Sequence, residues 1–351
     1  MRRERHLFFI YSDFHYLICK SIISVNHIPQ EECFFVCGRG TEVGDGDQVC
    51  PFRLYGSKSI WGRLVDYFVD FREIRSFFGG CDIIAYIPFR FIFPVEPYVS
   101  KIILYEEGFS AYKKECSKNL PSRNIIKTLL GAGLIALVST DLWGYFSLCR
   151  SYERDPSGLM KLYVCSEGAY QHFDSPFIDR DILKISKLEQ DYQFPIPSGS
   201  YFMVFDRFNT SIGFYSLQNY KMCLAKMVDY CKQNHVREVW GKLHPADWQF
   251  KDAKDIAETF FMDEGVGLNW YEGKLEMLAM QDNHITFLGT NSTILFYAPI
   301  FGMSNKSVSF SRYLASIDDK YNQFIRGFGG IDEFVSIFSE HVECLEFNAN
   351  S

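Results

Sequence analysis

Two apolar runs that each end in a short polar signature constrain the fold of this chain most strongly. Lys101–Tyr105 has the composition of a buried strand and is followed directly by a Glu-Glu-Gly turn at Glu106–Gly108. Val236–Leu243 has the same character and is followed by a His-Pro pair that begins at His244. In open α/β sheets, ligands bind beyond the carboxyl ends of the strands. The sequence therefore predicts one strand-end site in each half of the chain.

Further apolar runs of strand length alternate with segments of helical periodicity. The other predicted strands are Leu7–Tyr11, Glu32–Cys37, Asp82–Ile87, Tyr201–Phe205 and Ile285–Gly289. Three helices are predicted over Ile60–Phe78, Asn124–Leu148 and Ser216–Gln233. Two more are predicted from their first residues, one after a cap at Ser12-Asp13 and one that begins at Ile294. Continuous apolar strands that alternate with helices indicate an α/β fold with parallel sheets covered on both faces.

A break in this alternation divides the chain into two predicted domains. Phe194–Ser200 contains two prolines and a glycine, which interrupt regular structure and suggest a hinge. We predict Rossmann-like domains over residues 1–194 and 201–351, with the last helix packing back on the first domain as an open alternative. Two-domain dehydrogenases share this outline, but no GxGxxG motif follows a strand here.

Composition excludes several classes of protein. The net charge of −7 argues against a nucleic-acid binder, which would present a strongly basic surface. The 11 cysteines are scattered and form no CxxC pair, which favours free thiols in a reducing cytosol over a disulfide framework or a zinc site. We therefore expect a cytoplasmic protein.

Membrane contact is the open question of localisation. The apolar run after the basic N-terminus ends at Asp13, too early for a signal peptide. The longest uncharged stretch, between Lys127 and Asp141, is too short to span a bilayer. The apolar helix Asn124–Leu148 fits a core or interdomain helix, and its alternative is a surface that rests peripherally on the inner membrane.

The strand-end residues suit a transfer reaction. Glu106 and Glu107 are adjacent carboxylates, and repulsion between them in a partly buried site would raise the proton affinity of one, as a general base requires. Pro245 biases His244 towards an extended conformation, from which the imidazole could bind a phosphate, and Lys242 adds a positive charge nearby. The structural alternatives are a solvated surface turn and a strand-end histidine with local partners.

Two further elements lie downstream. Ser292 and Thr293 begin a helix, where hydroxyls and unbonded backbone N–H groups favour an anion, although ordinary helix caps look the same. Glu276 lies in an otherwise apolar helix and could accept hydrogen bonds from a base amino group, or be a solvated helix residue.

In their order along the chain, four segments resemble the motifs of bacterial GT-B sialyltransferases. Tyr105–Tyr112 is similar to their [Asp/Glu]-[Asp/Glu]-Gly motif, including the flanking tyrosines, and Lys242–Pro245 is similar to their His-Pro motif. Leu275–Met280 and Gly289–Thr293 resemble the cytosine-contacting and phosphate-binding segments. The departures are Glu-Glu where several relatives have Asp-Asp and Ser-Thr where others have Ser-Ser. The resemblance fits polysialyltransferases and lipooligosaccharide sialyltransferases alike.

The resemblance implies a role for each matching residue. Glu106 would be the general base with Glu107 as its support, and His244 would stabilise the CMP phosphate as the leaving group departs. The donor-binding residues that it implies are Lys242, His244, Pro245, Glu276, Ser292 and Thr293. Glu276 would read the cytosine amino group, and the two hydroxyl residues would hold the phosphate.

The implied protein is an inverting, metal-independent glycosyltransferase without a cofactor. It would move sialic acid from CMP-sialic acid to a hydroxyl of a bacterial surface glycan, such as lipopolysaccharide O-antigen, lipooligosaccharide or capsule. The acceptor would end in galactose or sialic acid and could be lipid-linked, and hinge closure would bring the two strand-end sites together. Three alternatives stay open: a transferase for another CMP-activated acidic sugar such as Kdo, a nucleotide-sugar epimerase, and a non-catalytic polysaccharide-assembly module.

Overall fold

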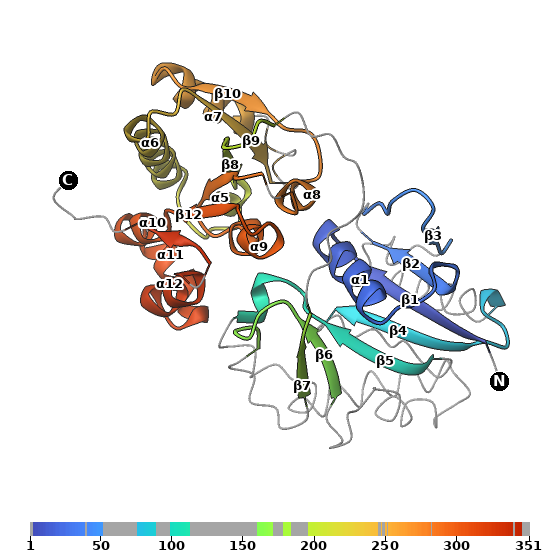
Figure 1. The fold of residues 1–351 in the computed structure, drawn as a ribbon. Helices are drawn as coiled ribbons and strands as arrows, with labels where there is room; N and C mark the ends of the chain where they lie inside the picture. Colours follow the sequence, from blue (N-terminus) through green and yellow to red (C-terminus); the bar gives the residue numbers. More distant parts are fainter. Residues whose placement is uncertain are drawn as a thin grey trace. The chain divides into compact units, whose positions relative to one another are not determined.

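The computed structural model describes most of the chain and divides it into two compact units. The described residues are 3–38, 41–51, 76–88, 99–112, 160–170, 178–183, 196–244, 247, 250, 252–281, 283–339 and 341–345. The first unit comprises Met1–Ala111 and Cys116–Ser186, and the second comprises Tyr112–Glu115 and Lys187–Ser351 (Figure 1). Each unit is built around its own parallel sheet.

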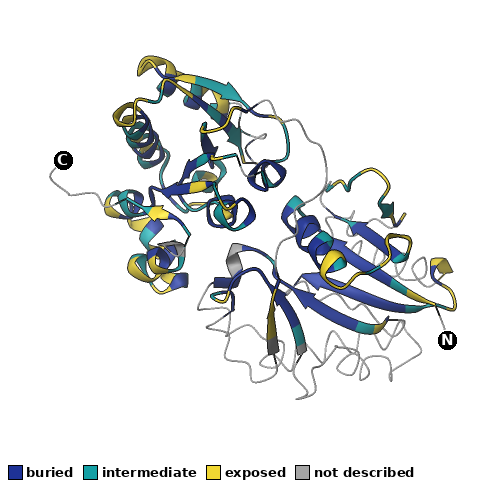
Figure 2. Cartoon of the chain, viewed as in Figure 1, coloured by how far each residue is buried: buried dark blue, intermediate teal, exposed yellow. Residues whose placement is uncertain are grey.

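In its described residues, the first unit contains a seven-stranded sheet in the order β3-β2-β1-β4-β5-β6-β7. The strands are β1 Glu4–Ile10, β2 Cys33–Cys37, β3 Gln48–Val49, β4 Asp82–Pro88, β5 Val99–Tyr105, β6 Met160–Val164 and β7 Ile178–Ile182. All described pairings are parallel. The apolar runs predicted to form buried strands do so, and Figure 2 shows β1, β4 and β5 buried along most of their length.

Short helices accompany this sheet. They are α1 Asp13–Val25, η1 Gln30–Glu32 and η2 Phe109–Tyr112. The predicted cap of α1 is confirmed, because Ser12 has extended backbone angles and its side chain accepts a hydrogen bond from His15 N at 3.3 Å. This cap turns the chain directly from the carboxyl end of β1 into a helix, so the start of α1 lies at the ligand-binding edge of the sheet.

The described residues of the second unit repeat the design with a six-stranded parallel sheet in the order β10-β9-β8-β11-β12-β13. Its strands are β8 Tyr201–Phe205, β9 Glu238–Leu243, β10 Gly267–Trp270, β11 Thr286–Gly289, β12 Lys306–Ser309 and β13 Glu343–Cys344. Its helices are α5 Phe208–Ser211, α6 Leu217–Gln233, α7 Asp252–Asp263, α8 Leu275–Ala279, α9 Thr293–Phe301, α10 Ser311–Ile317, α11 Asp319–Ile325, η6 Arg326–Phe328 and α12 Ile331–Ser339. The predicted helix from Ser216 is α6, which Ser216 caps.

The described strands of the two sheets follow the same order over six positions, with β7 added at one edge of the first sheet, and that order places their ligand-binding edges. In each, the chain winds outwards from a central strand, β1 or β8, and then restarts on its other side with β4 or β11. Ligands of open α/β sheets bind at this switch point, beyond the carboxyl ends of the strands. The groups that follow β1, β5, β8, β9 and β11 are therefore the ones to inspect.

Some predictions fall wholly or partly outside the described residues. The helix Asn124–Leu148 lies outside them, as do most of Ile60–Phe78 and Pro195 of the predicted hinge. Within Ile196–Ser200, the Gly199 N–H and the Ser198 hydroxyl both donate to the Asn283 carbonyl at 3.1 Å, so this segment is fastened to the second unit. Its role as a hinge stays a prediction, as does the packing of the last helix on the first domain. Among the described helices, none combines the length and apolar character that crossing a bilayer requires.

Candidate active site

The Glu-Glu-Gly turn directly follows β5, and its two carboxylates have different surroundings. Glu106 is fully buried, its backbone N–H donates to the Tyr163 carbonyl at 2.9 Å, and its Oε2 accepts from the Cys165 N–H at 2.6 Å. The residue therefore extends the pairing with β6 and fastens its carboxylate to that strand. Gly108 then turns the chain with a φ of 126°, a conformation that side chains with a Cβ rarely adopt.

Glu107 is half-buried, and its backbone is held from two sides. Its N–H donates to the Tyr170 hydroxyl at 3.3 Å, and its carbonyl lies 3.0 Å from His15 Nε2. The Tyr11 N–H donates to His15 Nδ1 at 3.2 Å, so Nδ1 is an acceptor and we assign the ring proton to Nε2, which donates to Glu107. A neutral His15 thus links the start of α1 to the turn after β5.

Tyr105 adds a second link between β5 and β1. Its ring is fully buried, lies edge-on to His15 with centroids 5.5 Å apart, and its hydroxyl donates to the Phe9 carbonyl. The carboxyl end of β5 is therefore fixed by β6 on one side and by β1 and α1 on the other. A turn held in this way leaves the half-buried Glu107 little freedom to move.

In the second unit, His244 follows β9 as the sequence predicts. Its N–H is shared between the Phe205 carbonyl at 3.0 Å and Asp247 Oδ2 at 3.1 Å, and its ring stacks on Phe208 with an interplanar angle of 7°. The residue is exposed, but the protein atoms packed against it lower the pKa of the imidazole, and the negative charge of Asp206 opposes this shift. Pro245 lies outside the described residues.

Two buried aspartates that the sequence interpretation missed support this edge of the sheet. Asp206 directly follows β8, and Asp247 lies three residues after His244. Asp247 is fully buried and accepts hydrogen bonds from the backbone N–H groups of Phe208 and His244, and burial raises its pKa to about 6. A single acid after a strand is a weak signal, but its position directly after an apolar run could have identified Asp206.

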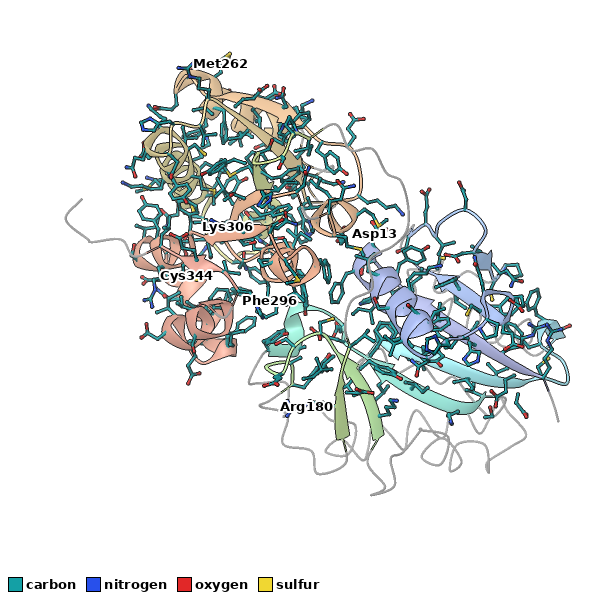
Figure 3. The ribbon with its side chains drawn as sticks, viewed as in Figure 1. Asp13, Arg180, Met262, Phe296, Lys306 and Cys344 are labelled. Carbon is teal, nitrogen blue, oxygen red and sulfur yellow. The ribbon has the colours of Figure 1, made fainter. Side chains whose placement is uncertain are left out.

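The predicted phosphate segment follows β11. Ser292 is the N-cap of α9, and within the described residues its side chain makes no capping hydrogen bond to that helix. Thr293 is the first helical residue and is exposed. Figure 3 marks this helix by Phe296, and it marks the start of α1 in the first unit by Asp13. An uncapped helix start at the carboxyl end of a parallel strand is a favourable position for an anion.

Lys242 and Glu276 gather around Tyr271, which follows β10. Lys242 Nζ lies 5.6 Å from the centroid of the Tyr271 ring and donates to the Gly273 carbonyl. Glu276 is half-buried in the first turn of α8, and burial together with the charge of Glu276 raises the pKa of the Tyr271 hydroxyl. The structure therefore brings these two predicted donor-binding residues to one neighbourhood of the second unit.

The described residues of the predicted site thus form one group in the first unit and three in the second, namely His244, the start of α9 at Ser292 and Thr293, and the pair Lys242 and Glu276 near Tyr271. Glu106 and Glu107 lie at the carboxyl end of β5, and His244 lies with Asp206 at the carboxyl ends of β9 and β8. Among the described residues, no cluster of three His, Cys, Asp or Glu side chains has the arrangement of a metal site.

Comparisons with known proteins concern the fold. No protein-family model matches the sequence, and no curated protein is similar to it. A sialyltransferase from Photobacterium damsela has a similar structure, with a TM-score of 0.50 and 16% identity over 98% of this chain and 82% of that one. The structure of WaaG, a glycosyltransferase involved in lipopolysaccharide biosynthesis, matches with a TM-score of 0.43 and 10% identity, over 95% of this chain and 93% of that one. The structure of a UDP-GlcNAc 2-epimerase from Neisseria meningitidis matches with a TM-score of 0.42 and 10% identity, over 96% of this chain and 93% of that one.

These findings define the class of fold. Two Rossmann-like units with parallel sheets, together with the whole-chain likeness to the Photobacterium enzyme, confirm the predicted α/β fold of the GT-B class. The chain therefore has a glycosyltransferase fold.

Proposed function

We propose that this protein is a sialyltransferase that moves sialic acid from CMP-sialic acid to a hydroxyl of a bacterial surface glycan, with inversion at the anomeric carbon. The observation that carries the proposal is the placement of the predicted groups. Each of the three central ones, the Glu-Glu-Gly turn, His244 and the segment that ends in Thr293, directly follows the carboxyl end of a parallel strand. A glycosyltransferase fold and the motif order point to the same reaction.

In the proposed reaction, a carboxylate takes the proton of the acceptor hydroxyl while its oxygen attacks the anomeric carbon and CMP leaves. A general base must contact the hydroxyl that attacks the anomeric carbon. Glu107 is half-buried, whereas Glu106 is fully buried and its carboxylate accepts a hydrogen bond from the Cys165 N–H. We therefore assign proton transfer to Glu107 and the supporting role to Glu106, which reverses the order that the sequence resemblance implied.

The surroundings of the two acids support this division of roles. Glu106 is fully buried, which keeps it from contact with an acceptor, whereas Glu107 is only half-buried. The hydrogen bond from His15 to the Glu107 carbonyl and the hydrogen bond from the Glu107 N–H to the Tyr170 hydroxyl hold the backbone of Glu107 in place, which lowers the cost of orienting the base.

The second unit would bind the donor. CMP carries one phosphate, whose negative charge grows as the bond to the sugar breaks. His244 and the start of α9 at Ser292 and Thr293 each follow the end of a strand, and together they would stabilise this charge without a divalent ion. Lys242, Pro245 and Glu276 would complete the donor site, with Glu276 accepting hydrogen bonds from the cytosine amino group.

The acceptor and the location follow from the same proposal. The acceptor would be a galactose- or sialic acid-terminated glycan of lipopolysaccharide, lipooligosaccharide or capsule, bound mainly by the first unit. An enzyme that uses a CMP-sugar and a lipid-linked acceptor would work in the cytoplasm at the surface of the inner membrane. Metal independence and these partners belong to the proposal.

A donor panel tests the proposal. The protein is incubated with CMP-sialic acid, CMP-Kdo or UDP-GlcNAc, each with a lactose-terminated acceptor, a sialyllactose-terminated acceptor or no acceptor, and the products are identified by mass spectrometry. We expect a mass gain of one sialic acid on an acceptor. Transfer of Kdo but not of sialic acid would indicate that the donor is CMP-Kdo, which shares the nucleotide and the carboxylate with CMP-sialic acid. Conversion of a UDP-sugar without an acceptor would indicate an epimerase, and no reaction with any donor would favour a non-catalytic module.

A further inference from the structure

The carboxylate of Asp206 is a junction within the second unit. It directly follows β8, is 4% exposed, and its Oδ2 accepts from Thr290 Oγ1 at 2.6 Å and from Asn209 Nδ2 at 3.1 Å. Thr290, which is 84 residues away in sequence, directly follows β11. A buried carboxylate with hydrogen-bond donors of this kind fixes the groups around it, because breaking either bond would leave a polar atom unsatisfied.

Thr290 is also held through its backbone. Its carbonyl accepts from Ser309 Oγ and from Ser311 Oγ, both at 2.6 Å, and these two hydroxyls lie 2.7 Å from each other. The Thr290 hydroxyl also lies 2.9 Å from Asn291 Oδ1. These contacts are shielded from solvent, because Thr290 is only 1% exposed. The first residue of the segment before α9 is therefore fixed from β8, from β12 and from the start of α10.

This fixed residue is two positions before the N-cap of α9. The helix begins at Thr293 after the cap Ser292, so the direction of its first N–H groups depends on the path of the chain from Thr290. The negative charge of Asp206 also acts on His244 and opposes the lowering of the imidazole pKa by burial. One buried side chain thus contacts the segment that precedes α9 and lies near the histidine after β9.

We propose that Asp206 and Thr290 are positioning residues of the donor site: they hold Thr290–Ser292 so that the first N–H groups of α9 meet the phosphate of a nucleotide. The inference rests on the proposed function and adds two residues to it. Neither residue would contact the nucleotide. Preorganised donors bind a phosphate tightly because no reorganisation is needed when the ligand arrives, and a loosened loop loses that advantage.

Removal of the Thr290 hydroxyl tests this role. Thr290→Val keeps the shape of the side chain and removes its hydrogen bond to Asp206, and Thr290→Ser keeps the hydroxyl. Affinities for CMP and for cytidine are measured by calorimetry on each folded variant. We expect Thr290→Val to bind CMP about tenfold more weakly, equivalent to about 1.4 kcal/mol. Thr290→Ser should stay within about threefold of the wild type, and cytidine binding should be unchanged in both variants.

The comparison of CMP with cytidine separates positioning from a general structural effect. A phosphate-positioning role weakens CMP alone, whereas a distorted unit weakens both ligands equally, and that second result would overturn the inference. Thr286→Val is the matched control, because it is the same substitution at the opposite end of β11. Should Thr290→Val not fold, Ser311→Ala removes one of the two hydroxyls on the Thr290 carbonyl and is expected to weaken CMP selectively.

The wild type distinguishes failure of this inference from failure of the proposed function. If the wild type binds neither CMP nor cytidine, the proposed function fails and the inference falls with it. If the wild type binds CMP more tightly than cytidine and Thr290→Val retains the whole difference, only the positioning role is wrong. Equal affinity of the wild type for CMP and cytidine would also refute the positioning role, because no phosphate site would then exist to be positioned.

Discussion

Replacement of Glu107 by Gln removes the carboxylate that we place at the acceptor hydroxyl and preserves the size of the side chain. The half-buried Glu107 has its backbone held by His15 and Tyr170, so the substitution should leave the turn in place. Loss of a general base typically lowers turnover by about 10²–10⁴-fold, which corresponds to about 2.7–5.4 kcal/mol of barrier. We expect kcat to fall in this range while the affinity for CMP stays the same.

Glu106→Gln is the matched variant, one residue away in the same turn. The Oε2 of Glu106 accepts from the Cys165 N–H at 2.6 Å, and the Gln carbonyl oxygen can still accept that bond. The substitution therefore replaces a charge-assisted hydrogen bond by a neutral one, which should lower the free energy of unfolding by about 1–2 kcal/mol. We expect a smaller loss of turnover than in Glu107→Gln, accompanied by lower stability.

The assays are initial rates of sialic acid transfer at saturating donor, CMP affinity by calorimetry and urea-induced unfolding, on both variants and the wild type. Wild-type turnover in Glu107→Gln would refute the assignment of the base. A loss of at least 10²-fold in Glu106→Gln with unchanged stability would restore the assignment that the sequence resemblance implied, with Glu106 as the base.

Three further predictions concern the second unit and the absence of a metal requirement. Two sets of variants test the phosphate site: His244→Ala, and the double change of Ser292 and Thr293 to Ala. Each should raise the barrier for donor cleavage by roughly 2.7–4 kcal/mol and leave acceptor binding unchanged. Unchanged donor kinetics would refute the assignment of these residues to the phosphate. EDTA should leave activity intact, and activity that EDTA abolishes and Mg²⁺ or Mn²⁺ restores would contradict this. Two aspartates should shift stability with pH in opposite directions. Burial raises the pKa of Asp318, but hydrogen bonds from Ser216, Asn219, Tyr321 and Lys320 outweigh it and leave the pKa below its usual value. The stabilisation by Asp318 is therefore present at neutral pH and lost as pH falls through its folded pKa, so Asp318→Ala should cost more at pH 7 than at pH 3, by urea unfolding. Burial raises the pKa of Asp247 to about 6, so its contribution falls as pH rises from about 4 to about 6, and Asp247→Asn should cost more at pH 4 than at pH 7.

The sequence predicts the strands near the middle of each sheet, because their apolar runs reflect burial on both faces of a parallel sheet. It does not identify the outer strands, which are β3, β6, β7, β10, β12 and β13. Tyr201–Phe205 coincides with β8, and Leu7–Tyr11 overlaps β1, which begins three residues earlier. The caps Ser12 and Ser216 begin α1 and α6 as predicted. A helix cap is a local feature, since its hydrogen bond reaches only three residues along the chain. These elements could therefore be predicted from neighbouring residues alone.

The support of the site could not be predicted in the same way, because its contacts join residues that are far apart in sequence. Asp206 and Thr290 are separated by 84 residues and meet only because β8 and β11 are neighbours in the sheet. The different burial of Glu106 and Glu107 has the same origin. Two adjacent acids look alike in a sequence, and the difference arises when β6 offers the Cys165 N–H to one of them.

The central claim is that the protein transfers sialic acid from CMP-sialic acid with inversion. The most direct test is to follow the reaction with a galactose-terminated acceptor by proton NMR, which identifies both the sugar that is transferred and the configuration of the new bond. The donor is β-linked, so a single in-line attack predicts an α-linked sialoside that forms together with CMP. A β-linked product, or release of CMP with no glycosidic bond to any galactose- or sialic acid-terminated acceptor, would contradict it.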